Sequence, residues 1–406
     1  MSEWKKVRLK DCCHSISDGD HLPPPKSDSG VPFVTIANID ATNHIDFGNT
    51  MFVPYEYYNN LNDIRKAKFN DILYSVVGSF GKPVLIKDNK PFAFQRHIAI
   101  LRPNNEIVDS RFLYYVMLSR DFYMQADTVA IGAAQRTISL TALRNMEVEL
   151  PSMEIQHRIA NILSRYDSLI ENYQKQIKLL EEAAQRLYKE WFVDLHFPGH
   201  ENTNIVDGLP EGWEKKKISD VCTMIGAGST PSRRNNAYWD DGNIRWVKTK
   251  ELLDNWIFDT EEYITEEGLN NSSTKMFPVN TILMAIYASP TLGRLGILAQ
   301  ECCCNQAALG LVANEKLISW VWLYLKLFEL RDEFNAVARG AGQQNISGVV
   351  VKNWEITVPN KKTIEDFAKM AKPYFENAKS LQSQLRLLTE ARDRLLPKLM
   401  SGEITI

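Results

Sequence analysis

The chain has 406 residues, of which 44% are hydrophobic and 24% charged, so it is long enough for two or more globular domains, each with its own core. Its net charge of −3 excludes a strongly basic protein, so any phosphate-binding surface must be local. No apolar run is long enough to span a bilayer, and the first ten residues are too polar for a secretory signal, so we expect a cytoplasmic protein without membrane contact.

The cysteines and histidines indicate neither disulfides nor a metal centre. The six cysteines lie at positions 12–13, 222 and 302–304, without the spacing of a disulfide framework or a zinc site. No HExxH pair occurs, and His196 and His200 flank a Pro-Gly turn without a second pair of ligands nearby. We expect reduced thiols, no metal and no cofactor.

The first half of the chain reads as a β-rich domain followed by one long helix. Short apolar runs at residues 31–36, 76–86 and 92–101 are separated by Gly, Pro and Asn-Asp turns and predict strands, and a helix is expected at 110–119. From Pro151 onward, apolar residues recur every three or four positions. This spacing predicts a single helix of about 40 residues that ends at the Pro-Gly of positions 198–199.

The second half repeats this order. A polar stretch at 200–212 leads to Trp213, where a second β-rich domain begins, with a helix expected at 319–330. Another apolar seam then starts after Pro359 and ends near Ser401-Gly402, with Arg392 as its one charged position.

The two halves are copies of one pattern. Residues 132–139 (GAAQRTIS) align with 340–347 (GAGQQNIS), an offset of 340 − 132 = 208 residues, and the stretches before Pro151 and Pro359 match in the same register. Upstream, Gly81-Lys82 aligns with Gly293-Arg294 after small gaps. The gaps indicate loops of different length on one scaffold.

Each long helix carries an apolar stripe that its own domain is too small to cover, because 40 residues extend about 60 Å. We therefore expect the two stripes to pack on each other as an antiparallel coiled coil with a pseudo-twofold repeat, giving an α+β fold. The residues expected to pack are Ile155, Ile159, Tyr166, Ile177, Leu180, Leu187, Phe367, Tyr374, Leu381, Leu385, Leu388 and Leu395. The alternative is that the helices serve only for dimerisation.

Three short sequence motifs of this chain resemble motifs of the specificity subunits of type I restriction-modification enzymes. They are the closing LPKLMSGEI at 396–404, the AGSTPS turn at 227–232, which is similar to the family's GGTPS, and the paired GxxQxxIS strings. Together with the two variable domains and two long helices, the resemblance covers the whole chain. The first copy has HLPPP at residues 21–25 in place of the Thr-Pro-Ser turn.

The resemblance implies a non-catalytic subunit that reads a two-part DNA target. It assigns target-recognition domains to residues 1–150 and 213–358, spacer helices to 151–197 and 359–406, and a linker to 198–212. The implied partners are double-stranded DNA, two modification (methyltransferase) subunits and the restriction (translocase and nuclease) subunits. The alternative is a coiled-coil scaffold or decoy that binds those subunits without reading DNA.

Polar and basic residues in the predicted turns are the candidates for DNA contact. Gln and Arg side chains suit adenine and guanine edges, and a cation after a glycine suits a phosphate. The candidates are Lys66, Lys68, Lys82, Arg96, His97, Arg136, Thr137, Ser232, Arg233, Arg234, Lys248, Thr249, Lys250, Arg294, Gln344 and Asn345. For Gln135 and Gln343 we favour a turn cap, and ordinary hairpin turns are an alternative explanation for Lys82 and Arg294.

Catalytic motifs are missing from the sequence. We find no Walker A loop, no convincing cluster of metal-binding carboxylates, no glycine-rich adenosylmethionine motif and no Asn/Asp-Pro-Pro-Tyr/Phe string. Catalysis is therefore expected in partner chains.

Overall fold

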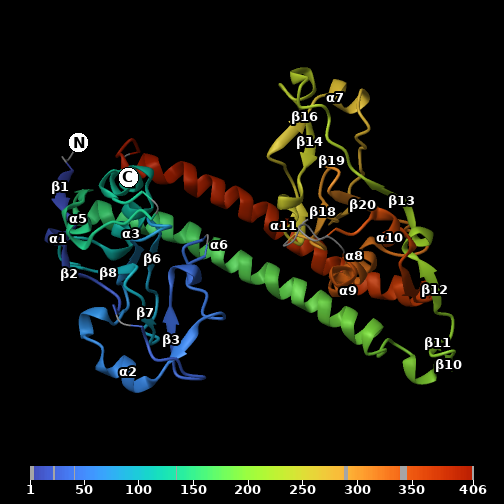
Figure 1. The fold of residues 1–406 in the computed structure, drawn as a ribbon, viewed down its shortest axis with the longest axis horizontal. Helices are drawn as coiled ribbons and strands as arrows, with labels where there is room; N and C mark the ends of the chain where they lie inside the picture. The colour runs from blue at the N-terminus through green and yellow to red at the C-terminus, as the bar shows by residue number, and fades with distance from the viewer. Residues whose placement is uncertain are drawn as a thin grey trace. The chain divides into compact units, whose positions relative to one another are not determined.

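The computed structural model describes residues 4–404 except for residues 22, 41, 134, 288–290 and 339–344. The chain forms two compact units: unit 1 comprises residues 1–170 and 387–406, and unit 2 comprises residues 171–386. The long helices α6 (Met153–Tyr188) and α11 (Lys361–Met400) each contribute one part to each unit. Figure 1 draws α6 in green and α11 in red.

Unit 1 is built on two small sheets and a strand pair. The four-stranded sheet has the order β2 (Cys13–Asp18), β8 (Ile98–Pro103), β5 (Ile72–Ser75), β6 (Pro83–Leu85). The three-stranded sheet has the order β4 (Met51–Val53), β3 (Val31–Val34), β7 (Ala93–Phe94), and β1 (Lys5–Arg8) pairs with β9 (Glu147–Leu150). The helices are α1 (Leu9–Cys12), α2 (Tyr55–Asn60), α3 (Ser110–Leu118), α4 (Arg120–Val129) and α5 (Leu140–Asn145).

Unit 2 repeats this plan with one added strand. Its larger sheet has the order β13 (Cys222–Ala227), β20 (Ala308–Ala313), β17 (Ile282–Ala285), β18 (Leu295–Leu298), β15 (Asn255–Ile257). The smaller sheet has the order β16 (Glu262–Ile264), β14 (Ile244–Val247), β19 (Cys303–Cys304), and β12 (Glu214–Lys217) pairs with β21 (Glu355–Val358). The helices are α7 (Glu266–Asn270), α8 (Trp320–Glu329), α9 (Arg331–Val337) and α10 (Gly348–Asn353), and β10 (Ile205–Val206) pairs with β11 (Leu209–Pro210).

The short helices start where the sequence places a capping side chain. Asp109 accepts hydrogen bonds from the first backbone N–H groups of α3, and Ser319 does the same for α8, as expected for helix N-caps. Both helices bury most of their apolar residues against the sheets. The predicted helices at 110–119 and 319–330 therefore form within one residue of the expected bounds.

The apolar run at 76–86 does not form one strand. β5 ends at Ser75 and β6 begins at Pro83, with a loop between them. Gly78 and Gly81 adopt φ angles of +68° and +92°, values that strand residues do not take, so the chain turns back instead of continuing. The run remains buried at its ends, which explains why its composition resembled a single strand.

In unit 2, the end of α6, the turn at Lys189–Val193 that follows it and the start of α11 share an aromatic core. The Phe367 ring lies 6.1 Å from Tyr188, 5.7 Å from Trp191 and 4.9 Å from Phe192, measured between ring centroids. Closer to the middle of each helix, the Gln382 amide lies 3.5 Å from the Glu181 carboxylate. Residue number rises along α6 as it falls along α11 between these contacts.

In unit 1, the start of α6 and the end of α11 share one hydrophobic core. Ile159, Leu163 and Leu399 are buried together, and Leu395 packs against the same cluster. The Arg392 guanidinium lies 2.9 Å from the Asp167 carboxylate, so the one charged position in the second seam has an opposite charge beside it.

Candidate nucleic-acid interface

A loop after β5 and its counterpart after β17 place two predicted cations at equivalent positions. The backbone N–H of Ser75 donates to the carbonyl of Lys82 at 3.1 Å, and that of Ala285 donates to Arg294 at 2.9 Å. Gly81 and Gly293, directly before the cations, have positive φ angles of +92° and +78°. Glycine is needed here because L-residues with a Cβ rarely adopt this conformation.

The surroundings of these two cations differ. The Lys82 ammonium donates to the carbonyl of Ile39 at 3.4 Å, a long hydrogen bond that leaves most of its donor capacity available. The Arg294 guanidinium is half-buried and makes no hydrogen bond or ion pair with the described residues. Both cations are thus available for an anionic partner.

The GxxQxxIS strings also fold alike where the structure describes them. Ile138 donates to the carbonyl of Val76 at 2.8 Å, and Ile346 donates to Ile286 at 3.0 Å. Immediately before these isoleucines, Thr137 forms an antiparallel β-bridge with Val77, and Asn345 forms one with Tyr287. Thr137 and Asn345 are therefore equivalent residues, whereas Gln344 lies outside the described residues.

A shallow hollow in unit 1 gathers several of the predicted residues. Its volume is about 330 Å³, and its walls include Arg96, His97, Gln135 and Thr137, with Asp18 at the end of β2. Arg96 is exposed and its guanidinium has no hydrogen-bond or ion-pair partner among the described residues. Segments far apart in sequence thus present a cation, an imidazole, an amide and a hydroxyl to one space.

Arg136 lies close to this hollow but has partners of its own. Its guanidinium forms an ion pair with Asp127 and lies 5.4 Å from the centroid of the Phe80 ring. An arginine held in this way has less freedom to bind a base edge than Arg96 has.

The two lysines of unit 1 that were predicted to contact DNA, Lys66 and Lys68, differ in whether their ammonium groups are already paired. The Lys66 ammonium donates to the carbonyl of Asn59 at 2.9 Å and lies 3.5 Å from the Asp63 carboxylate. Lys68 is exposed, and its ammonium has no partner among the described residues. Of the two, Lys68 is the more accessible cation.

In unit 2, three of the predicted cations converge on two glutamates. The Lys248 ammonium lies 2.6 Å from Glu262 and 3.2 Å from Glu261, and Lys250 lies 2.6 Å from Glu261. Arg233 pairs with Glu262. Burial alone would raise the pKa of Glu262, but hydrogen bonds from Lys248 and Arg233 lower it below its ordinary value. The acidic pair explains why a basic cluster adds little to the net charge.

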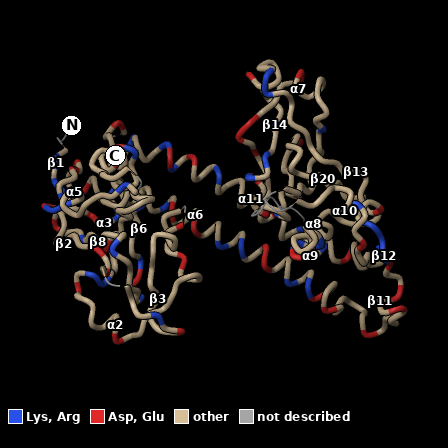
Figure 2. The backbone as a smooth tube through the Cα atoms, in the orientation of Figure 1, with Lys and Arg blue, Asp and Glu red and all other residues tan. Residues whose placement is uncertain are grey.

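Arg233 also covers two tryptophans. Its guanidinium carbon lies 3.5 Å from the Trp239 ring centroid and 5.1 Å from that of Trp246. Next to it, Ser232 and Arg234 are exposed, and Thr249 is half-buried beside the lysines. Figure 2 shows Lys and Arg positions interspersed with Asp and Glu positions along the tube in unit 2 and along both long helices.

One polar residue of unit 2 stands in the site without a motif that distinguishes it in the sequence. Gln306 is exposed, and its side-chain oxygen accepts a hydrogen bond from the Thr230 hydroxyl at 2.6 Å. Thr230 belongs to the AGSTPS turn, so the turn holds the amide in one orientation. An alignment with a two-residue gap would pair Gln306 with Arg96, since 306 − 96 = 210 against the offset of 208 used at the GxxQxxIS strings.

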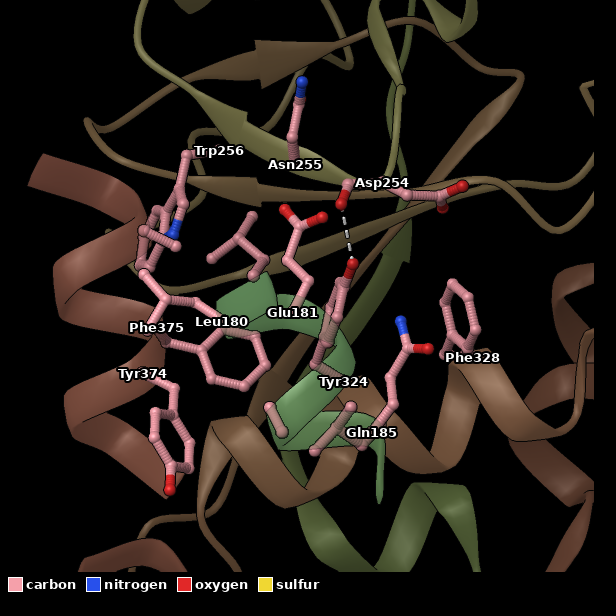
Figure 3. A pocket seen from close by; sticks show the side chains of 14 residues that line it. Leu180, Glu181, Gln185, Asp254, Asn255, Trp256, Tyr324, Phe328, Tyr374 and Phe375 are labelled. Atoms are coloured by element: carbon pink, nitrogen blue, oxygen red, sulfur yellow. Dashed lines mark hydrogen bonds between the residues drawn. The ribbon is translucent and has the colours of Figure 1, made fainter. Parts of the chain in front are cut away.

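An aromatic-walled cavity of about 200 Å³ lies in unit 2 between α6, α8 and α11. Figure 3 shows Glu181 and Tyr324 directed toward Asp254, whose carbonyl accepts the Tyr324 hydroxyl hydrogen bond at 2.8 Å. Burial, and then the nearby charge of Asp254, raise the pKa of Glu181 to about 7. The cavity is lined by elements that hold the unit together, and none of the predicted DNA contacts lies in it.

Within the described residues, no group of three His, Cys, Asp or Glu side chains is arranged to hold a metal ion. In the same part of the chain, no helix is both long and apolar enough to cross a membrane. All six cysteines are free thiols.

The family model for the type I restriction modification DNA specificity domain matches residues 1–182 and again residues 210–386. The chain belongs to this family. The two matches contain the two sheet-bearing parts of the chain, so the internal repeat is a repeat of one specificity domain.

Named relatives agree with this assignment. The specificity subunit of the type I restriction enzyme HindI from Haemophilus influenzae is 24% identical, with 100% of both chains covered. That of MjaIX from Methanocaldococcus jannaschii is 27% identical over 75% of this chain and 71% of its own length. The crystal structure of a type I restriction-modification S subunit from M. genitalium matches with a TM-score of 0.66 at 16% identity, covering 98% of this chain and 96% of that one, which shows a shared fold.

Proposed function

We propose that the chain is the sequence-reading subunit of a type I restriction-modification enzyme and that each recognition domain binds one half of a bipartite DNA target. The observation that carries this proposal is the duplication of polar turns on one scaffold with different side chains. Lys82 and Arg294 keep a cation at equivalent backbone positions, as contacts to the phosphate backbone of both half-sites require. Thr137 and Asn345 are also equivalent but differ in side chain, and such a difference on a shared frame suits two half-sites of different sequence.

The proposed recognition domains comprise residues 1–150 and 213–358, and the spacer helices comprise 151–197 and 359–406, with a linker at 198–212. We propose that the helices form an antiparallel coiled coil and that the repeat is pseudo-twofold. In support, Gln382 and Phe367 contact α6 residues in reverse order within unit 2, and Arg392 contacts Asp167 within unit 1. A stiff pair of helices would set the spacing between half-sites better than a flexible linker.

The chain is proposed to act without catalysing a reaction and to dock two modification subunits and the restriction subunits, which supply the chemistry. It needs no cofactor for reading DNA. Its place would be the cytoplasm, where cellular DNA is the substrate and free thiols persist.

A methylation assay tests this function. The chain is co-expressed with its modification subunits in a host without other methylation, and modified bases are located across the genome. The proposal predicts one interrupted motif that appears only when the chain is present. A complex that forms but methylates nothing, and leaves no salt-dependent footprint on DNA, would instead favour the scaffold or decoy alternative.

A further inference from the structure

The turns at residues 95–97 and 305–307 occupy the same place in the two units. In unit 1, the backbone N–H of Gln95 donates to the carbonyl of Val34 at 3.1 Å. In unit 2, Asn305 makes the same bond to Val247 at 2.9 Å. Each turn follows the short strand that pairs in parallel with the centre of the three-stranded sheet, β7 on β3 and β19 on β14.

The ends of the two turns also coincide. Gly19 donates to the carbonyl of Ile98 at 3.1 Å, and Gly228 donates to Ala308 at 3.1 Å. Ile98 and Ala308 begin equivalent strands, β8 and β20. Both turns therefore contain three residues between fixed points, and the middle positions, 96 and 306, correspond.

A glycine directly after β2 in unit 1, and one directly after β13 in unit 2, packs closely against each turn. A Cβ built on Gly19 would lie 2.1 Å from the carbonyl oxygen of Phe94, and one on Gly228 would lie 2.0 Å from that of Cys304. No side chain fits at those separations, so the backbone of each turn packs directly against the segment that follows β2 or β13. The middle residue is thus presented from a rigid support.

The two middle residues are exposed and differ in chemistry. Arg96 presents a guanidinium without a partner among the described residues, on the wall of the hollow in unit 1. Gln306 presents an amide whose oxygen is oriented by the Thr230 hydroxyl at 2.6 Å, which leaves its NH2 group and one oxygen lone pair available. One position therefore carries a forked double donor in unit 1 and a donor-acceptor pair in unit 2.

These two patterns are complementary to different purines. A guanidinium donates to both O6 and N7 of guanine, whereas a glutamine amide accepts from N6 and donates to N7 of adenine. A position that contacted only phosphate would favour a cation in both units, and Gln306 is uncharged. The difference in charge at one position therefore points to base reading.

We propose that Arg96 and Gln306 are equivalent specificity-determining residues, with Arg96 selecting a guanine in one half-site and Gln306 an adenine in the other. This inference rests on the proposed DNA-reading function. It assigns one base to each half-site and links each half-site to a unit of the chain.

The experiment maps methylation genome-wide for the full chain with its modification subunits, as wild type and as Arg96→Gln, Arg96→Lys and Gln306→Arg. We expect Arg96→Gln to replace or relax one guanine in a single half-site, with the preference at that base falling roughly 10-fold or more. Gln306→Arg should alter one adenine in the other half-site only. Arg96→Lys, which keeps the charge but loses the fork, should weaken the guanine preference.

Lys90→Gln serves as the matched control because Lys90 is an exposed cation of unit 1 outside the turn. The motif methylated with this variant should be the same as with the wild type. An unchanged motif in Arg96→Gln and Gln306→Arg would overturn the inference. So would a loss of methylation that is uniform across all sites, because that is the signature of a phosphate contact. A wild-type chain that directs no methylation would instead contradict the proposed function itself, so the two failures are distinguishable.

Discussion

Replacing Glu181 with glutamine should stabilise unit 2 at alkaline pH. Glu181 lies on α6 at the edge of the aromatic cavity, and the Gln382 amide is 3.5 Å from its carboxylate. Burial is the main reason that its pKa rises from the ordinary value of 4.5 to about 7. A carboxyl group with a raised pKa binds its proton more tightly in the folded state than in the unfolded state. The free energy of unfolding therefore falls as the pH rises from about 4.5 through 7.

The size of the effect follows from this pKa difference. A shift from 4.5 to about 7 corresponds to at most about 3.4 kcal/mol at pH 8, at about 1.36 kcal/mol per unit. Because the side chain is only partly buried, solvent screening reduces this to about 1.5 kcal/mol. Glu181→Gln keeps the size of the side chain and removes the charge, so it should raise the melting temperature of unit 2 by roughly 3–6 °C at pH 8.

Calorimetry at pH 5 and pH 8 measures this difference. At pH 5 the gain should fall to less than half, because most of the folded-state penalty develops above that pH. Glu182→Gln is the matched control, since Glu182 is on the same helix and pairs at 3.6 Å with Arg186, whose side chain is 83% exposed, so its loss should change stability by less than about 1 kcal/mol. A lower melting temperature for Glu181→Gln at pH 8, or equal gains at both pH values, would refute the reasoning.

Three further outcomes are expected. Asp167→Asn removes one of the two carboxylate partners of Arg392, the other being Asp393, and should lower the unfolding free energy of unit 1 by about 1–3 kcal/mol in urea titrations; the loss should shrink when Arg392→Gln is added, and simple additivity would contradict the pairing. Gly228→Ala forces a Cβ to within 2.0 Å of the Cys304 carbonyl, so melting temperature and DNA affinity should both fall, and wild-type values for both would contradict a tightly packed turn. Lys82→Ala should reduce the slope of log affinity against log salt by about 1 without changing the methylated motif, and an unchanged slope would exclude a phosphate contact.

The sequence predicts the large features of the fold because they depend on long periodic signals. The apolar seams after Pro151 and Pro359 run through ten or more turns, and α6 and α11 form there. The helix at 110–119 is also correct, since an acidic N-cap at Asp109 precedes an apolar run. The duplication was visible because the GxxQxxIS strings keep one offset.

Details of the candidate site depend on contacts between distant residues, which no local pattern records. Arg136 resembles a free cation in sequence, yet it pairs with Asp127 from α4. Lys248 pairs with Glu262 from the next strand of the sheet. Gln306 aligns with Arg96 only after a two-residue gap, because the loops between the repeats differ in length, and the hydrogen bonds of the sheet fix this correspondence.

The most direct test of a bipartite reader is a domain exchange. Residues 1–150 are replaced by the matching domain of a specificity subunit with a different known target, and the methylated motif is read genome-wide with the modification subunits present. The account predicts that one half-site changes to that of the donor, while the other half-site and the spacer length stay as in the wild type. A motif in which both halves change, or in which neither does, would contradict it.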